Sequence, residues 1–129
     1  MTAPDRAALG RGAEDLAAAH LQAAGARIVL RNFRRRRGEL DIVALHHDTL
    51  LVVEVRLRSS DEFGGSAASV DHRKQRRIAS TTRQLLQLHR ELARHPVRFD
   101  VIAISRRAHD RAGDACEIEW IRHAFEMRG

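Results

Sequence analysis

The chain has little of what an exported or membrane-spanning protein needs. Cys116 is its only cysteine, so no internal disulfide can form, and we expect this residue to be a small apolar filler. No run approaches the roughly 18 consecutive apolar residues of a membrane helix. The first residues, MTAPDRAALG, lack the apolar core of a signal peptide. We therefore expect a cytoplasmic protein that has no membrane partner.

Aromatic residues and lysine are also scarce. Phenylalanine and tryptophan make up 4% of the chain and tyrosine is missing, which argues against base stacking as the main contact to a nucleic acid. Lys74 is the only lysine among 23 lysine and arginine residues. A gene whose base composition has drifted toward arginine codons would show the same bias.

The charge balance points to a polyanionic partner. The net charge is +6 at pH 7 and the pI is near 11.2, which indicates a nucleic acid held through its phosphate backbone. The alternative is a basic chain without such a partner.

Several common sites are excluded by spacing. The eight histidines show no zinc-finger spacing, and a single cysteine cannot complete a finger. The chain contains neither a P-loop nor a Gly-x-Gly-x-x-Gly after a strand.

At 129 residues with 43% apolar content, the chain predicts one domain, residues 1–129, with a single core. Apolar periodicity predicts two helices and a set of strands in the order α-β-β-β-α-β-β, which gives a mixed central sheet flanked by helices and an α/β fold. The helices are expected at 5–24 and 69–94, a hairpin at 38–58, and further strands at 26–33, 97–105 and 115–121.

The hairpin GELDIVALHHDTLLVVEVRLR carries charges at alternate positions of each strand, so each pair shares one face. A two-residue turn at His47-Asp48, or a four-residue loop over 46–49, places Asp41 opposite Glu54 and Glu39 opposite Arg56. An odd-length loop would break this pairing.

Two carboxylates directly opposite each other destabilise a sheet unless a cation lies between them. A hard divalent ion such as Mg²⁺ suits one or two carboxylates, with waters and phosphate oxygens as its other ligands. The competing interpretation is a solvated sheet face. The continuous apolar run Leu51-Val52-Val53 argues against it, because both faces of that strand are then covered.

Charged residues on either side of the hairpin extend the candidate site. Glu14 lies at the edge of the apolar face of the first helix, where the simplest interpretation is a carboxylate in water. The run from Arg34 to Arg37 leads into Gly38 and is either a solvated loop or a phosphate-contacting one. Its place next to Glu39 and Asp41 favours the second interpretation.

These residues resemble a known family. Gly38-Glu39-Leu40-Asp41 followed by Val53-Glu54-Val55-Arg56 is similar to the PD-(D/E)xK pattern of restriction-endonuclease-like nucleases. More closely, residues 10–125 resemble the YraN-like family of small bacterial proteins, relatives of archaeal Holliday-junction resolvases. The likeness rests on an ordered set of segments: Gly12-Ala13-Glu14, Ala17, Leu21, Asn32-Phe33, 38–44, 53–58, Phe63-Gly64, Lys74, 98–101, Trp120 and Ala124-Phe125.

The resemblance implies a restriction-endonuclease-like αβββαβ core with its acidic site on the central hairpin. In such nucleases Asp41 and Glu54 would hold Mg²⁺ (or Mn²⁺) together with the carbonyl of Val55, and Glu14 would complete the acidic cluster. The ion would activate a water and neutralise charge on the phosphate. The resolvase relatives also allow a homodimer.

Arg56 departs from the pattern, which has lysine there. Arginine stays protonated and cannot act as a base, although it can stabilise phosphate charge. Either the general replacement of lysine by arginine extended to position 56 because catalysis requires little of that residue, or Arg56 has an electrostatic role. Lys74 then contacts DNA, approaches the metal site from the second helix, or has survived by chance.

We therefore predict a Mg²⁺-dependent endonuclease of duplex or branched DNA, with DNA favoured over RNA. The alternatives are a DNA-binding module that cleaves weakly or not at all, because of Arg56, and an interaction protein without a nucleic acid partner. The catalytic candidates are Asp41, Glu54, Arg56 and Glu14. The nucleic-acid-binding candidates are Arg34, Arg35, Arg36, Arg37, Arg58, Arg73, Lys74 and Arg77.

Overall fold

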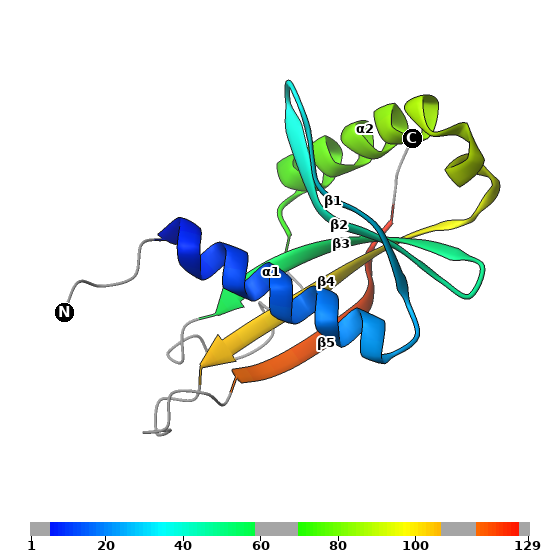
Figure 1. Ribbon diagram of the computed structural model, residues 1–129. Helices are drawn as coiled ribbons and strands as arrows, with labels where there is room; N and C mark the ends of the chain where they lie inside the picture. The colour runs from blue at the N-terminus through cyan, green and yellow to red at the C-terminus, as the bar shows by residue number, and fades with distance from the viewer. Residues whose placement is uncertain (1–5, 59–69, 107–115, 127–129) are drawn as a thin grey trace.

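A computed structural model of the chain describes residues 6–58, 70–106 and 116–126. Along the chain these residues form α1 (Arg6–Ala23), β1 (Arg27–Arg35), β2 (Gly38–His46), β3 (Thr49–Arg58), α2 (His72–Leu88), the 3-10 helix η2 (Arg90–Arg94), β4 (Val97–Arg106) and β5 (Cys116–Phe125) (Figure 1). Neither helix has the length and hydropathy to cross a lipid bilayer in the part of the chain described.

The strands form one mixed sheet in the order β1-β2-β3-β4-β5. All neighbouring strands are antiparallel except β3 and β4, which are parallel because α2 carries the chain back across the sheet. The predicted α/β class and the αβββαβ order of the core are confirmed.

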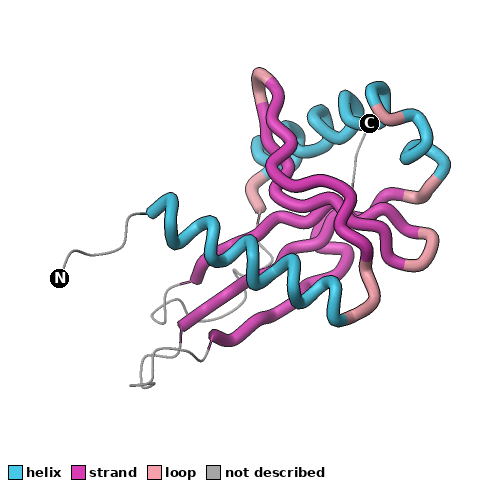
Figure 2. Tube along the Cα trace, viewed as in Figure 1, coloured by secondary structure: helices cyan, strands magenta, loops and turns pink. Residues whose placement is uncertain are grey.

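One helix covers each face of the sheet (Figure 2). Ala17 and Leu21 of α1 pack against one face, while Ile78 and Leu85 of α2 pack against the other. The central strands are therefore buried on both sides, which is why Leu51-Val52-Val53 reads as an uninterrupted apolar run.

The predicted register of the central hairpin is confirmed. The β2–β3 ladder runs from His46–Thr49 to Ile42–Val53, around a turn in which His47 has a φ of 57°. A left-handed residue suits a two-residue turn between twisted strands. The ladder ends one residue before Asp41 and Glu54, so these carboxylates lie where the two strands separate.

Other boundaries differ from those predicted. The β1–β2 ladder continues to Arg35–Gly38, so Arg34 and Arg35 belong to a strand and only Arg36 and Arg37 form the turn. In this ladder Glu39 lies opposite Arg34, and Arg34 Nε is 3.2 Å from Glu39 Oε1. The β2–β3 ladder on the other side of β2 ends at Ile42–Val53, before the predicted Glu39–Arg56 pair. The second helix begins at His72 and ends at Leu88, because His89 leaves helical geometry.

Gly38 is required by packing. A Cβ at this position would collide with Oγ1 of Thr81 and come within 3.3 Å of the carbonyl oxygen of Arg77. The backbone of β2 at Gly38 therefore lies directly against α2.

Asp100 ties β4 to β5 from inside the protein. Its side chain has no exposed surface, and it accepts hydrogen bonds from Arg98 Nε (2.9 Å) and Nη2 (2.8 Å), from Trp120 Nε1 (2.8 Å) and from the His123 amide (3.0 Å). The β4–β5 register shifts between Phe99 and Val101. The Asp100 carboxylate therefore accepts a hydrogen bond from the His123 amide where the ladder between the strands is interrupted.

Candidate functional site

Asp41 and Glu54 form the floor of the candidate site. Asp41 Oδ2 accepts a hydrogen bond of 2.9 Å from the Val55 amide, which fixes the carboxylate beside the next strand. Burial, followed by the negative charge of Glu54, raises the pKa of Asp41 from 3.8 to about 7. The two carboxylates therefore interact unfavourably when both are ionised, and the pair gains stability from a neighbouring cation.

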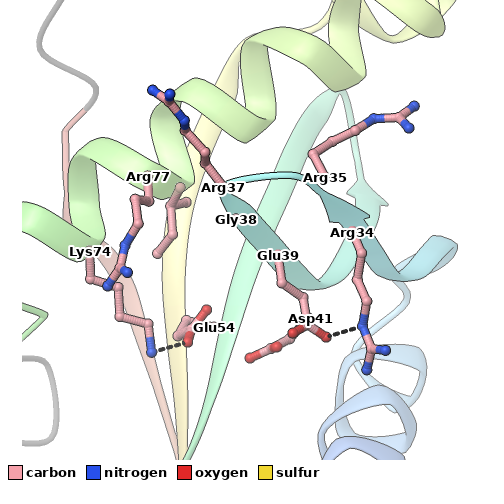
Figure 3. A pocket seen from close by; sticks show the side chains of 10 residues that line it. Arg34, Arg35, Arg37, Gly38, Glu39, Asp41, Glu54, Lys74 and Arg77 are labelled. Carbon is pink, nitrogen blue, oxygen red and sulfur yellow. Dashed lines mark hydrogen bonds and ion pairs between the residues drawn. The ribbon is translucent and has the colours of Figure 1, made fainter.

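Lys74 brings such a cation from α2. Asp71 caps the helix by accepting a 2.8 Å hydrogen bond from the Lys74 amide, which sets the position of this residue in the first turn. The Lys74 Nζ lies 2.6 Å from Glu54 Oε1 (Figure 3). Lys74 therefore reaches Glu54 from the second helix, while its predicted approach to a metal ion and its predicted contact with DNA stay predictions.

Asn32 bridges two further carboxylates, those of Glu14 and Glu39, and no role was predicted for it. Its φ of 55° is a conformation that asparagine tolerates better than most residues. With its amide nitrogen turned toward the carboxylates, it donates to Glu14 Oε1 (2.9 Å) and Glu39 Oε1 (3.2 Å). Burial raises the pKa of Glu14, and the charge of Arg31 and the hydrogen bond from Asn32 lower it by less, so the net shift is upward.

The acidic residues do not form a preassembled metal cage. Among the residues that the structure describes, no three histidine, cysteine, aspartate or glutamate side chains are grouped so as to hold one ion. The Asp41–Glu54 pair alone still fits Mg²⁺, which binds through one or two carboxylates and retains water ligands. Lys74 already places a positive charge at this pair. The proposed contribution of Glu14 to the acidic cluster stays a prediction.

Arginines surround the acidic floor. An open pocket of about 380 Å³ lies over the two carboxylates, and it is lined by Arg34, Arg35, Arg37, Gly38, Glu39, Asp41, Glu54, Lys74, Arg77 and Ile78. In Figure 3 the Arg77 guanidinium extends toward Lys74 and Glu54, whereas those of Arg35 and Arg37 extend away from the floor. The acidic pair thus sits at the base of a basic pocket.

The other predicted residues lie outside this pocket lining. Arg36 is exposed in the β1–β2 turn and Arg73 is exposed on α2. Arg56 is half-buried on β3, two positions after Glu54 and on the same face of the strand. Arg58 is near Glu119 (Nη1 to Oε2, 3.4 Å) and lines a different pocket, and its contact with a nucleic acid stays a prediction.

Sequence comparisons match most of the chain to one protein family. A family model described as "Uncharacterised protein family UPF0102" matches residues 13–104. A "UPF0102 protein" of Stutzerimonas stutzeri (strain A1501) is 46% identical over 117 residues, which cover 91% of this chain and 93% of the relative. A "UPF0102 protein" of Ectopseudomonas mendocina (strain ymp) is 42% identical over 92% and 94%. A third, of Xanthomonas oryzae pv. oryzae (strain PXO99A), is 44% identical over 90% and 89%.

Proposed function

This chain belongs to the UPF0102 family, as its resemblance to YraN-like proteins predicted, and we propose that it is a metal-dependent endonuclease that hydrolyses duplex or branched DNA. The observation that carries the proposal is the Asp41–Glu54 pair at the base of an arginine-lined pocket. Carboxylates in such a position attract a divalent cation, while the surrounding arginines attract phosphates. The carboxylates complement the positive charge of a metal ion, and the arginines complement the negative charge of a phosphodiester.

Each part of the pocket has a task in this reaction. Asp41 and Glu54 would hold Mg²⁺ or Mn²⁺, which supplies charge neutralisation at the phosphate and a more acidic water. Arg34, Arg37 and Arg77 line the same pocket and can each donate two hydrogen bonds to a phosphate oxygen pair. The scarcity of aromatic residues favours recognition of backbone over bases, so we expect weak sequence preference.

The decisive test compares DNA cleavage by the native chain with cleavage by a variant that lacks the Glu54 charge. The native chain is expected to cut linear, flapped or four-way-junction DNA when Mg²⁺ or Mn²⁺ is added. Glu54→Gln keeps the shape of the side chain but removes its charge, and should lower the cleavage rate by at least about 100-fold.

The matched control is Glu91→Gln, which removes an exposed carboxylate from η2, outside the pocket. This variant should cleave at the native rate. Equal cleavage by the native chain and by Glu54→Gln, prepared side by side, would assign the activity to a contaminating nuclease and refute the proposal.

A second candidate function is DNA binding without cleavage. It is favoured by Arg56, which occupies the place of the lysine in the related nuclease pattern and cannot act as a base. Salt-sensitive DNA binding with no cleavage of any of the three substrates in either metal would support this candidate over the enzyme.

Both functions predict salt-dependent binding through the pocket arginines. Arg37→Gln and Arg77→Gln should each weaken DNA binding and reduce the slope of log K against log salt by about one. Arg94→Gln removes an exposed arginine of η2 that does not line the pocket, and should leave the slope unchanged. Fluorescence anisotropy across a salt series measures all three slopes. Equal slopes for all variants would place the DNA elsewhere on the protein.

A further inference from the structure

We propose that Lys74 is a catalytic residue of this site, which neutralises Glu54 in the metal-free protein and turns to the phosphate being cleaved once a metal ion binds Glu54. The inference rests on the proposed function and adds a residue to it. It also gives the ion pair between α2 and β3 a specific task in the reaction.

The first argument is the position of Lys74. Its backbone is held by the Asp71 cap, and its ammonium reaches Glu54 at 2.6 Å from a different element of the fold. The side chain of Glu54 is 12% exposed, whereas that of Lys74 is 47% exposed. The carboxylate is therefore largely enclosed in the floor, while about half of the lysine side chain is open to solvent.

The second argument is charge. Asp41 has Glu54, Glu14 and Glu39 as negative neighbours, all of which act on it electrostatically. One ammonium offsets only part of this negative charge. A divalent ion held by Asp41 and Glu54 would offset more of it and would compete with Lys74 for Glu54. The Lys74 ammonium would then be free to donate to a phosphate oxygen in the pocket.

The third argument is the chemistry of a primary ammonium. Lysine carries a compact charge with three rotatable donors on a flexible stem, so it can move between a carboxylate and a phosphate oxygen without the planar geometry that arginine needs. The other positively charged residues that line the pocket are arginines, and the chain has no other lysine.

The reaction balances without a proton leaving Lys74. A water oxygen forms a bond to phosphorus, one P–O ester bond breaks, and a water proton ends on the leaving oxygen after exchange with solvent. Lys74 stays an ammonium throughout and donates a hydrogen bond to a phosphate oxygen, where negative charge increases in the transition state.

The test separates a catalytic lysine from a structural one. Lys74→Met removes the charge and keeps the length of the stem. We expect Mg²⁺ to bind this variant about three- to tenfold more tightly, measured by calorimetry without DNA, because the competing cation is gone. At saturating metal, kcat should fall by about 100-fold with KM changed by less than about threefold.

Arg94→Met is the matched control, because it removes one exposed positive charge outside the pocket. Its Mg²⁺ affinity and kcat should equal those of the native chain. A Lys74→Met variant that behaves like this control, while Glu54→Gln is inactive, would overturn the role of Lys74 and leave the proposed function standing. Absence of cleavage by the native chain would instead refute the proposed function.

A second variant moves the ammonium. Arg56 follows Glu54 by two residues and shares its face of β3. In the Lys74→Met background, Arg56→Lys should raise kcat at least about tenfold, because it returns an ammonium to the face of β3 that carries Glu54. A single Arg56→Lys exchange that raises kcat as strongly in the native background would overturn the proposal, because the site would then lack a working lysine.

Discussion

Asp41→Asn is expected to raise the free energy of unfolding at pH 8 by about 2 kcal/mol, while removing divalent metal binding. Burial and the charge of Glu54 raise the pKa of Asp41 from 3.8 to about 7. At pH 8 the Asp41 carboxylate is therefore ionised in the folded protein, although it is buried and lies near the negative charge of Glu54. Asparagine avoids that charge, and its side-chain oxygen can still accept the hydrogen bond from the Val55 amide.

The pH dependence follows from the direction of this shift. A carboxyl group whose pKa is higher in the folded state stabilises the fold fully below pH 3.8, and this contribution is lost as the pH rises to about 7. The stability difference between Asp41→Asn and the native chain should therefore be small near pH 4 and reach its full size above pH 7. Urea unfolding at a series of pH values, without added metal, measures it.

Under the proposed function Mg²⁺ should reverse the order of stability, because the ionised Asp41 carboxylate of the native chain would be its ligand and the amide in Asp41→Asn would not. Glu91→Gln, at an exposed carboxylate on η2, serves as the reference and should follow the native curve. A native chain that stays more stable than Asp41→Asn at pH 8 without metal would contradict the picture of a carboxylate under electrostatic strain.

Asp100→Ala is expected to have the largest effect on stability, lowering the free energy of unfolding by about 3–5 kcal/mol. The carboxylate is fully buried and accepts two hydrogen bonds from Arg98, one from Trp120 and one from the His123 amide. Its removal leaves a guanidinium and two further donors without their partner inside the protein. Chemical unfolding followed by circular dichroism gives the change directly.

Trp120→Phe is the graded control for Asp100. It removes one donor and keeps the carboxylate paired with Arg98 and His123, so it should cost about 1–2 kcal/mol. Equal costs for Asp100→Ala and Trp120→Phe would show that the indole contact, rather than the buried ion pair, holds β5 to the sheet.

The sequence predicted the acidic floor because the features that set it are local. A short turn at His47-Asp48 and apolar, β-branched flanks specify the register of β2 against β3, and the ladder brings Asp41 and Glu54 together. The two flanking helices and the order of the elements follow from apolar periodicity in the same way.

Contacts between distant elements were not predictable in the same way. Glu39 pairs with Arg34 because the β1–β2 ladder extends past Phe33, which depends on cross-strand pairing rather than on the apolar pattern. Asn32 owes its bridging position to a left-handed backbone, for which the only signal was that asparagine tolerates it. The distance from Lys74 to Glu54 depends on how α2 is rotated over the sheet, which periodicity gives only coarsely.

The single lysine makes this site unusually simple to observe. The other 22 of the 23 lysine and arginine residues are arginines. One lysine ε-methylene resonance and one lysine ammonium resonance in the NMR spectrum therefore belong to Lys74 alone. That ammonium lies 2.6 Å from Glu54 Oε1. Titration of isotopically labelled lysine with Mg²⁺ or a short DNA duplex therefore reports on the acidic floor at one atom, without a mutation, a fluorophore or an assignment of the rest of the chain.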